Sequence, residues 1–253
     1  MLQTIKKIAT YSALTFLTAC GGGGGDGGAS VTDPTLSFPL RQAISDYVAK
    51  GLSEYYFFTG SYKNTDGSTY TVSGELQRSK TAASSITFEG RNAVRYTDSF
   101  NGNLTATDLL INGVKNTVVQ AYPSEYLSSY WDALTYSNLG SLSSSSYQVN
   151  SIVTDTPAFI KVGQQGTLYT SIDYLNSTKS TKKGSSKSTF EVLPDAASSV
   201  LINLTEVNYE SSGAYKSTVT NTFRVGLSGS FERVSGYITY ANGNQTTLTR
   251  INK

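Results

Sequence analysis

The segment YYFFTGSYKNTDGSTYTVSGEL, residues 55–76, decides the fold class of this chain. Apolar and aromatic residues occupy alternate positions on both sides of a polar segment: Tyr56, Phe58 and Tyr62 before it, and Tyr70, Val72 and Leu76 after it. Alternate residues of a strand share one face, and the polar segment Asn64-Thr65-Asp66-Gly67 is typical of a hairpin turn. The segment therefore predicts a β-hairpin with one apolar face.

The same period of two continues to the end of the chain. Candidate strands lie at residues 85–88, 93–99, 104–111, 117–122, 147–153, 168–174, 188–193, 200–209, 215–225, 231–240 and 246–251. Turn signals such as Asn112-Gly113, Ser212-Gly213 and Asn242-Gly243 separate them, and residues 138–146, rich in Ser and Gly, predict a loop or a linker. We expect an all-β domain over residues 39–253, an antiparallel up-and-down meander that forms a partly closed barrel or two packed sheets.

One amphipathic helix is expected before the first strand, over residues 39–50. The apolar residues at helical spacing are Leu40, Ala43, Ile44, Tyr47 and Val48. Pro39 suits a first helical turn and Gly51 suits the exit. The polar face is less basic than that of a membrane-surface helix, so we expect this helix to pack on the sheet or to plug its open end.

Two similar sequence segments raise the question of an internal duplication. Asn101-Gly102-Asn103 follows Phe88-Glu89, and Asn242-Gly243-Asn244 follows Phe231-Glu232 at a similar distance. A duplicated five-strand meander would explain this and would divide the domain at about residues 52–140 and 146–253. The alternative is that Asn-Gly is simply a favoured hairpin turn.

The first 19 residues have the features of a secretory signal. Lys6 and Lys7 precede a mostly apolar run over residues 8–16 that ends in small residues. This run is shorter than the ~20 residues that span a bilayer. We therefore predict a signal peptide at residues 1–19 that is not part of the fold.

The segment Leu17-Thr18-Ala19-Cys20 resembles the lipobox of bacterial lipoproteins. The resemblance implies that the signal is cut before Cys20, that this cysteine is acylated on sulfur and on its new amine, and that the acyl chains anchor the protein. Residues 20–38 then form an acylated, glycine-rich tether. A cysteine followed by glycines resembles uncharacterised lipoproteins of Gram-negative bacteria, and Gly21, where an Asp would retain the protein in the inner membrane, implies an outer-membrane location, periplasmic or surface-facing.

Composition restricts the chemistry of the chain. Cys20 is the only cysteine among 253 residues and there is no histidine, so disulfides within the chain, Ser-His-Asp and Cys-His catalysis, and zinc sites built on His or Cys are all excluded. Lys6 and Lys7 leave with the signal, so the mature chain carries 18 basic and 18 acidic residues. A neutral chain argues against a nucleic-acid partner. We infer no metal or cofactor.

Two remaining catalytic patterns are weak. Ser185-Ser186-Lys187 lies in a lysine-rich stretch that we expect to be a solvated hairpin tip or a patch touching anionic lipid phosphates. Glu125 and Asp132 are seven residues apart in the aromatic-rich run 122–134, the only such run that the sequence allows to be helical. On a helix they would be separated by ~10.5 Å, more than the ~6.5–9.5 Å of inverting glycosidases.

The same run contains the candidate ligand-binding residues, Tyr122, Tyr126, Tyr130 and Trp131. Aromatic rings with polar tips can stack on a sugar or another flat ligand. The alternative is that Leu127, Tyr130, Trp131 and Leu134, at helical spacing, pack on a sheet.

Together these features predict a lipid-anchored envelope lipoprotein that is a binding or structural module and not an enzyme. Its partners would be the membrane, through the acyl chains on Cys20, and an envelope polymer, lipid or protein. One alternative is a lipid or lipoprotein carrier with a hydrophobic cavity, and a second is a carboxylate-dependent hydrolase. A cavity large enough for an acyl chain would favour the carrier, and a filled core with an exposed aromatic patch would favour the module.

Overall fold

The computed structural model describes residues 32–122 and 126–252. Its helix is α2 (Leu40–Ala49). Its strands are β1 (Leu52–Lys63), β2 (Thr69–Lys80), β3 (Ser84–Phe88), β4 (Arg91–Ile111), β5 (Val114–Ala121), β6 (Tyr126–Asp132), β7 (Asn138–Leu142), β8 (Tyr147–Ile152), β9 (Gln165–Tyr174), β10 (Lys182–Ala196), β11 (Ser199–Glu210), β12 (Tyr215–Gly226), β13 (Phe231–Tyr240) and β14 (Gln245–Ile251).

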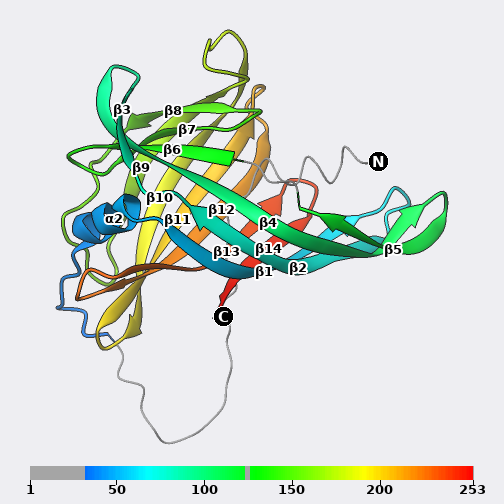
Figure 1. Cartoon of the computed structure of the whole chain (residues 1–253), viewed down its shortest axis with the longest axis horizontal. Coiled ribbons are helices and arrows are strands. Elements are labelled where there is room, and N and C mark those ends of the chain that lie inside the picture. The colour runs from blue at the N-terminus through cyan, green and yellow to red at the C-terminus, as the bar shows by residue number, and fades with distance from the viewer. Residues whose placement is uncertain (1–31, 123–125, 253) are drawn as a thin grey trace, which may run out of the picture.

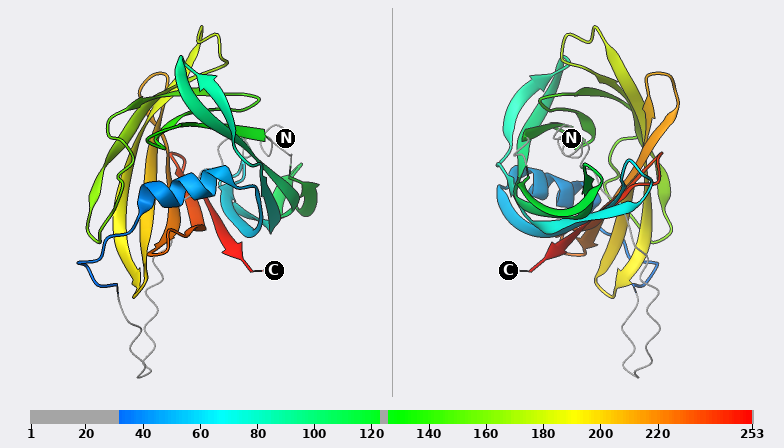
Figure 2. Two further views of the ribbon diagram at one scale, coloured as in Figure 1. Left: turned by 60° about the vertical axis from the view of Figure 1, so that its left-hand side comes forward. Right: turned by 90° about the vertical axis from the view of Figure 1, so that its right-hand side faces the viewer.

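Twelve of these strands close into one antiparallel barrel (Figures 1 and 2). Strands β6 to β14 follow one another in sequence order, β14 pairs with β1, β1 with β2, β2 with β4, and β4 with β6. The closing pair β1–β14 places Phe58 opposite Leu248. The predicted all-β meander with an N-terminal helix is therefore confirmed, in the closed form.

Strand β4 is long enough to serve two partners along one edge. Its residues 93–99 pair with β6, and its residues 103–111 pair with β5. Figure 1 shows the far end of β4 projecting beyond the barrel together with β5. On the opposite edge, β4 pairs with β3 and β2 in turn, so β3 and β5 are additions to the closed ring.

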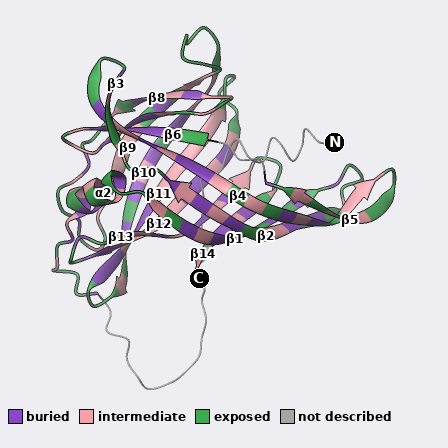
Figure 3. Cartoon of the chain, viewed as in Figure 1, coloured by how far each residue is buried: buried purple, intermediate pink, exposed green. Residues whose placement is uncertain are grey.

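The hairpin expected from residues 55–76 is the β1–β2 pair. The chain turns at residues 64–67, where Gly67 has φ +85° and its N–H donates to the carbonyl of Asn64. The inward-facing side chains of this hairpin belong to one buried cluster. They are Tyr56, Phe58, Tyr62, Tyr70, Val72 and Leu76. Figure 3 shows the alternation of buried and exposed residues along these strands.

The two Asn-Gly segments lie in unlike positions, so they give no support to an internal duplication. Asn242-Gly243 turns the chain between β13 and β14, as expected, but Asn101-Gly102-Asn103 lies within β4, paired with β2. The reason is close approach of two backbones, because a Cβ on Gly102 would overlap the carbonyl oxygen of Glu75. This glycine permits tight strand pairing and does not mark a turn.

Three further local expectations are corrected. The run 122–134, considered as a helix, contains strand β6, and the expected loop 138–146 contains strand β7. Residues 185–187 lie inside β10, not at a hairpin tip. In each case pairing with neighbouring strands, which local composition does not reveal, determines the conformation.

Helix α2 confirms the expected amphipathic segment and packs on inward-facing strand residues. Leu40, Ala43, Ile44 and Val48 are buried in one cluster with residues of β10, β11 and β12 that include Phe190, Val192, Val200, Ile202 and Val225. The helix therefore covers the barrel at the end where β10 turns into β11.

The described part of the expected tether packs on the barrel. The hydroxyl of Thr32 donates to the carbonyl oxygens of Ala196 and Ser199, at 2.9 and 2.7 Å, and Phe38 is fully buried and bridges Ile160. The expected signal peptide and Cys20 lie outside the described residues. Within the described ranges, no helix is long and apolar enough to cross a membrane.

Candidate functional site

The candidate site is a cavity of about 340 Å³ inside the barrel. This volume falls in the range of small-molecule sites, ~300–1,000 Å³. Apolar side chains line it near the helix: Leu40, Ile44, Phe190, Ile202, Phe223 and Phe231. Polar side chains line it further along the strands: Gln148, Asp173, Ser188, Glu206, Asn208 and Lys216. The cavity is therefore amphipathic.

Three of the four candidate ligand-binding aromatics line this cavity. Tyr122, Tyr126 and Trp131 are among its wall residues, and Tyr126 is 67% exposed, so the cavity reaches the surface beside it. Tyr130 is not in the cavity. It points to the outside of the barrel and stacks on Phe88 with a centroid distance of 4.1 Å, because successive side chains of β6 point to opposite faces.

Two carboxyl groups on the cavity wall have perturbed acidities. Burial raises the pKa of Glu206, although Oε2 of this residue accepts a hydrogen bond from the Tyr169 hydroxyl at 2.8 Å. Burial also raises the pKa of Asp173, against the opposing influence of Lys216. Gln148 lies beside both carboxyl groups and lowers the pKa of each, less than burial raises it, while its amide nitrogen donates to the hydroxyl of Ser171 at 3.1 Å. A protonated carboxyl can donate a hydrogen bond as well as accept one.

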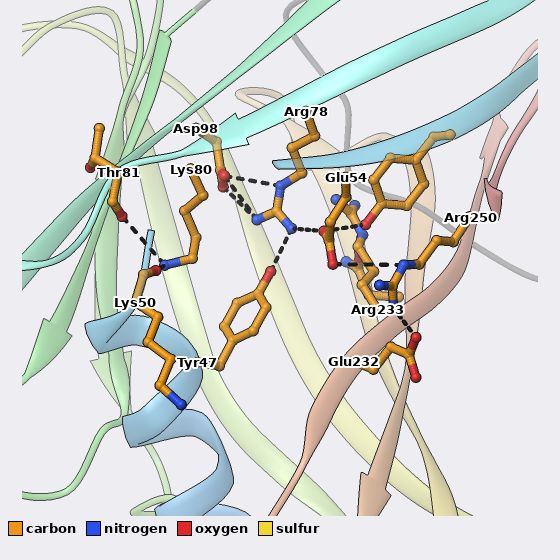
Figure 4. A network of polar contacts seen from close by, with 12 residues as sticks. Tyr47, Lys50, Glu54, Arg78, Lys80, Thr81, Asp98, Glu232, Arg233 and Arg250 are labelled. Atoms are coloured by element: carbon orange, nitrogen blue, oxygen red, sulfur yellow. Dashed lines mark hydrogen bonds and ion pairs between the residues drawn. The ribbon is translucent and has the colours of Figure 1, made fainter. Parts of the chain in front are cut away.

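A buried ionic network lies between the helix and the strands β1, β2 and β4 (Figure 4). Arg78, 3% exposed, makes two bonds of 2.9 Å to the carboxylate of Asp98. It also donates to Glu54 at 3.1 Å and to the hydroxyl of Tyr47 on α2. The network ties the helix to the barrel wall with paired charges, which is how ions are tolerated in an interior.

Lys80 stabilises the C-terminal end of α2. Its ammonium donates to the carbonyl oxygens of Val48, at 3.2 Å, and Lys50, which are at the end of the helix. These carbonyls lack intrahelical partners and carry partial negative charge. Burial lowers the pKa of Lys80 to about 8, and the neighbouring Asp98 acts in the opposite direction.

Arg233 on β13 is the least compensated charge on the cavity wall. It is 6% exposed, its Nη2 donates to Asn221 at 2.9 Å, and its guanidinium lies 5.6 Å from the ring centre of Tyr56. Burial lowers the pKa of Arg233, and no ion pair with a carboxylate is found for it in the described ranges. Its Nε has no hydrogen-bond partner.

These charged residues were not predicted from the sequence, although the sequence contains a signal for them. Arg78 follows Leu76 by two residues, and Arg233 follows Phe231 by two, so each charge occupies the same strand face as an inward-facing apolar side chain. A charge in the apolar register of a strand indicates either an interior network or an exposed end. Only the partners on other strands distinguish the two.

The other sequence candidates have structural positions. Glu125 lies outside the described residues. The carboxylate of Asp132 accepts the N–H groups of Leu134 and Thr135, each at 3.0 Å, and pairs with Arg91 at 2.8 Å. Burial opposes ionisation, yet these bonds together hold the pKa of Asp132 below its usual value. Asp132 therefore stabilises the turn after β6.

The stretch 185–187 does not form a Ser-Lys pair. Ser186 is buried, with its hydroxyl 2.6 Å from that of Ser171, whereas Lys187 is on the exposed outer face of β10. Neighbouring strand residues point to opposite faces, so the two side chains diverge.

Neither a metal cluster nor a relative identifies the site. In the described part of the chain, no group of three or more His, Cys, Asp or Glu side chains could hold a metal ion. Comparison of the chain with protein-family models, with curated proteins and with solved structures found no match.

Proposed function

We propose that this protein is a lipid-anchored protein of the outer membrane that binds a small amphipathic molecule inside its barrel. The cavity of about 340 Å³ is the observation that carries the proposal. Its apolar end accommodates hydrocarbon, and its polar wall accommodates a head group. Of the binding functions that the sequence leaves open, the cavity favours a carrier of a lipid or similar amphiphile over a module with a filled core.

Two unpaired donors on the cavity wall support the presence of a ligand. The indole Nε1 of Trp131 and Nε of Arg233 are buried without hydrogen-bond partners. Buried donors without partners are rare in folded proteins and call for an explanation. Both side chains line the cavity, so these unpaired donors lie next to the volume that a ligand would occupy.

The anchor and the location rest on Leu17-Thr18-Ala19-Cys20 and Gly21. Acyl chains on Cys20 attach the barrel to a membrane, and a carrier at a membrane surface has direct access to amphiphiles. The neutral mature chain supports a lipid or protein partner and no nucleic acid.

Mass spectrometry of the purified, acylated protein tests the proposal. We expect a small amphiphile to copurify with the wild type and to be lost from Ser188→Phe, which fills the cavity from β10. The matched control is Lys187→Phe, because Lys187 is the next residue on the same strand and faces outward. The proposal would be contradicted if no amphiphile copurified with the wild type. It would also be contradicted if Ser188→Phe retained as much amphiphile as the control variant.

The carboxyl groups of Asp173 and Glu206 favour a second candidate, carboxylate-dependent hydrolysis of the bound molecule. Burial raises the pKa of both groups, which is the direction that favours a carboxyl group as a general acid. A panel of glycosides and esters, assayed with wild type and Glu206→Gln, tests this candidate. Hydrolysis that depends on Glu206 would support it, and no hydrolysis of any substrate in the panel would argue against it.

A further inference from the structure

We infer that Arg233 binds the carboxylate of the amphiphile, so that the ligand is a monocarboxylic acid with an apolar chain. This inference rests on the proposed function, because it assumes that the cavity holds an amphiphile. It adds the charge of the head group, its binding residue and its position in the cavity.

The ionic network around Arg233 contains more positive than negative charges. Seven ionisable side chains make up this network: the basic residues Arg78, Lys80, Arg233 and Arg250, and the acidic residues Glu54, Asp98 and Glu232. Among the described residues, all but Arg233 and Lys80 have an ion-pair partner, and Lys80 has several carbonyl acceptors. Arg78 and Arg250 have carboxylate partners, and Lys80 has the helix carbonyls. The network therefore carries one positive charge in excess.

The excess charge lies at Arg233, on the wall of the cavity. Arg233 is 6% exposed, so its guanidinium has little contact with water, and the neutral side chain of Asn221 supplies only one acceptor. An arginine does not escape this cost by losing its proton. Arg233 lines the cavity, so a ligand in the cavity lies against this side chain, although its unpaired Nε is itself covered by neighbouring atoms.

A buried guanidinium is best satisfied by an anion with two acceptor atoms. A guanidinium offers donors in a planar fork, which a carboxylate accepts through two parallel hydrogen bonds. One negative charge neutralises an excess of one positive charge. A phosphate monoester, with up to two negative charges at neutral pH, would leave the network negative. The charge count thus favours a monoanionic head group, and we take the planar carboxylate as the one that matches the fork.

An apolar surface lies beside Arg233. Phe223 lies directly across the β12–β13 pair from Arg233, and Phe231 is two residues before it on the same face. The two phenylalanine rings stack with a centroid distance of 4.6 Å, and Phe231 contacts Tyr47 of α2. A ligand whose carboxylate reaches Arg233 would therefore lay its chain along apolar side chains that also line the cavity.

Trp131 provides the probe for a direct test. It is the only tryptophan of the chain and lines the cavity, so a brominated ligand that enters the cavity quenches its fluorescence. The delipidated full-length protein is titrated at pH 7, where Lys80 is protonated, with dibromostearic acid and, separately, with the neutral dibromostearamide. We expect the acid to bind wild type about ten- to a hundredfold more tightly than the amide, the usual contribution of hydrogen bonds to a charged group.

Three variants locate the preference. Arg233→Gln removes the charge, so the acid should bind as weakly as the amide, with amide binding unchanged. Arg233→Lys should retain a preference for the acid. Lys187→Gln, which removes one positive charge from the outer face of β10, should bind both ligands as wild type does. Near-ultraviolet circular dichroism confirms that each variant is folded.

The outcomes separate this inference from the proposed function. If neither ligand quenches Trp131 in wild type, the cavity does not bind amphiphiles and both ideas fail. If acid and amide bind wild type equally, or if Arg233→Gln keeps the preference for the acid, the proposed function survives and the carboxylate site at Arg233 is refuted.

Discussion

Tyr130 and Trp131 are adjacent in sequence, yet their rings lie on opposite sides of the barrel wall. Tyr130 stacks on Phe88 outside the barrel, with a centroid distance of 4.1 Å, while Trp131 lines the cavity and faces Tyr96 at 6.4 Å. The outer ring contributes to packing of the β3–β4 hairpin on β6, and the inner ring contributes to the cavity. Substitutions at these two positions should therefore separate stability from ligand binding.

Tyr130→Ala should destabilise the protein by about 3 kcal/mol, because it removes a large buried ring from the outer cluster with Phe88 and Tyr147. Binding of an amphiphile in the cavity should not change. Tyr130→Phe, which keeps the stacked ring, is the matched control and should be close to wild type. Urea unfolding measures stability, and titration calorimetry measures binding. A loss of affinity in Tyr130→Ala at a temperature where it is folded would contradict the assignment of this ring to the outer wall.

The placement of Tyr130 and Trp131 also shows where sequence reasoning reached its limit. Leu127, Tyr130 and Trp131 share a face on a helix, whereas on a strand Leu127 and Trp131 face one way and Tyr130 the other. The aromatic run fits both patterns locally. Pairing of Tyr96 with Ser129, residues 33 positions apart in the chain, makes the segment a strand. The hairpin at 55–76 was predictable because strict alternation and its turn chemistry both lie within 22 residues.

The buried charges were out of reach for the same reason. Arg78 finds Asp98 on β4 and Glu54 on β1, and only the strand order brings the three together. The sequence shows a charge in the inward register of β2 but not its partners. Likewise, the sequence Asn101-Gly102 resembles a turn signal. Only the strand pairing shows that Gly102 instead permits the close approach of β2 to β4.

Arg78→Met should destabilise the protein by about 3–5 kcal/mol, because the carboxylate of Asp98 would stay buried without its ion-pair partner and Glu54 would keep only the more distant Arg250, at 3.8 Å. The triple variant with Asp98→Asn and Glu54→Gln should recover much of this loss, since no uncompensated charge remains at those positions. Chemical denaturation of the single and triple variants checks this. A triple variant as unstable as Arg78→Met would show that packing of the arginine, and not its charge, supports the helix.

Cys20→Ala should leave an unprocessed precursor. Without the thiol there is no acceptor for the first acyl chain, and lipoprotein maturation cannot begin. Labelling of cells with a radioactive fatty acid, followed by precipitation of the protein, gives the measurement, and wild type is the positive control. Label on the Ala variant would refute the anchor at Cys20.

The wild-type protein should fractionate with the outer membrane, because Gly21, and not an aspartate, follows Cys20, the proposed site of acylation. Gly21→Asp should shift the protein to the inner membrane. Gly22→Asp, one residue further along, is the control and should stay with wild type. Density-gradient separation of the two membranes decides the question, and wild type in the inner membrane would count against the sorting prediction.

Glu206→Gln should make the protein more stable at pH 8 and should have no such effect near pH 4. Burial raises the pKa of Glu206 in the folded protein, whereas the unfolded chain has the ordinary value of about 4.3. Between these two values the folded state binds more protons than the unfolded state, so stability falls as the pH rises through this window. Glutamine cannot ionise and can still accept the hydrogen bond from Tyr169, so the variant avoids that loss.

Thermal unfolding of Glu206→Gln across pH 4 to 8 measures this difference. Glu191→Gln is the control, because Glu191 is exposed on the neighbouring strand β10 and its removal changes the formal charge by the same amount. The curve of wild type should fall relative to that of Glu206→Gln as the pH rises, and the curve of Glu191→Gln should run parallel to wild type. A Glu206→Gln variant that is less stable than wild type at pH 8 would mean that the ionised carboxylate is stabilised in the cavity, by Lys216 or another cation, and that the polar wall is built to hold a negative charge there.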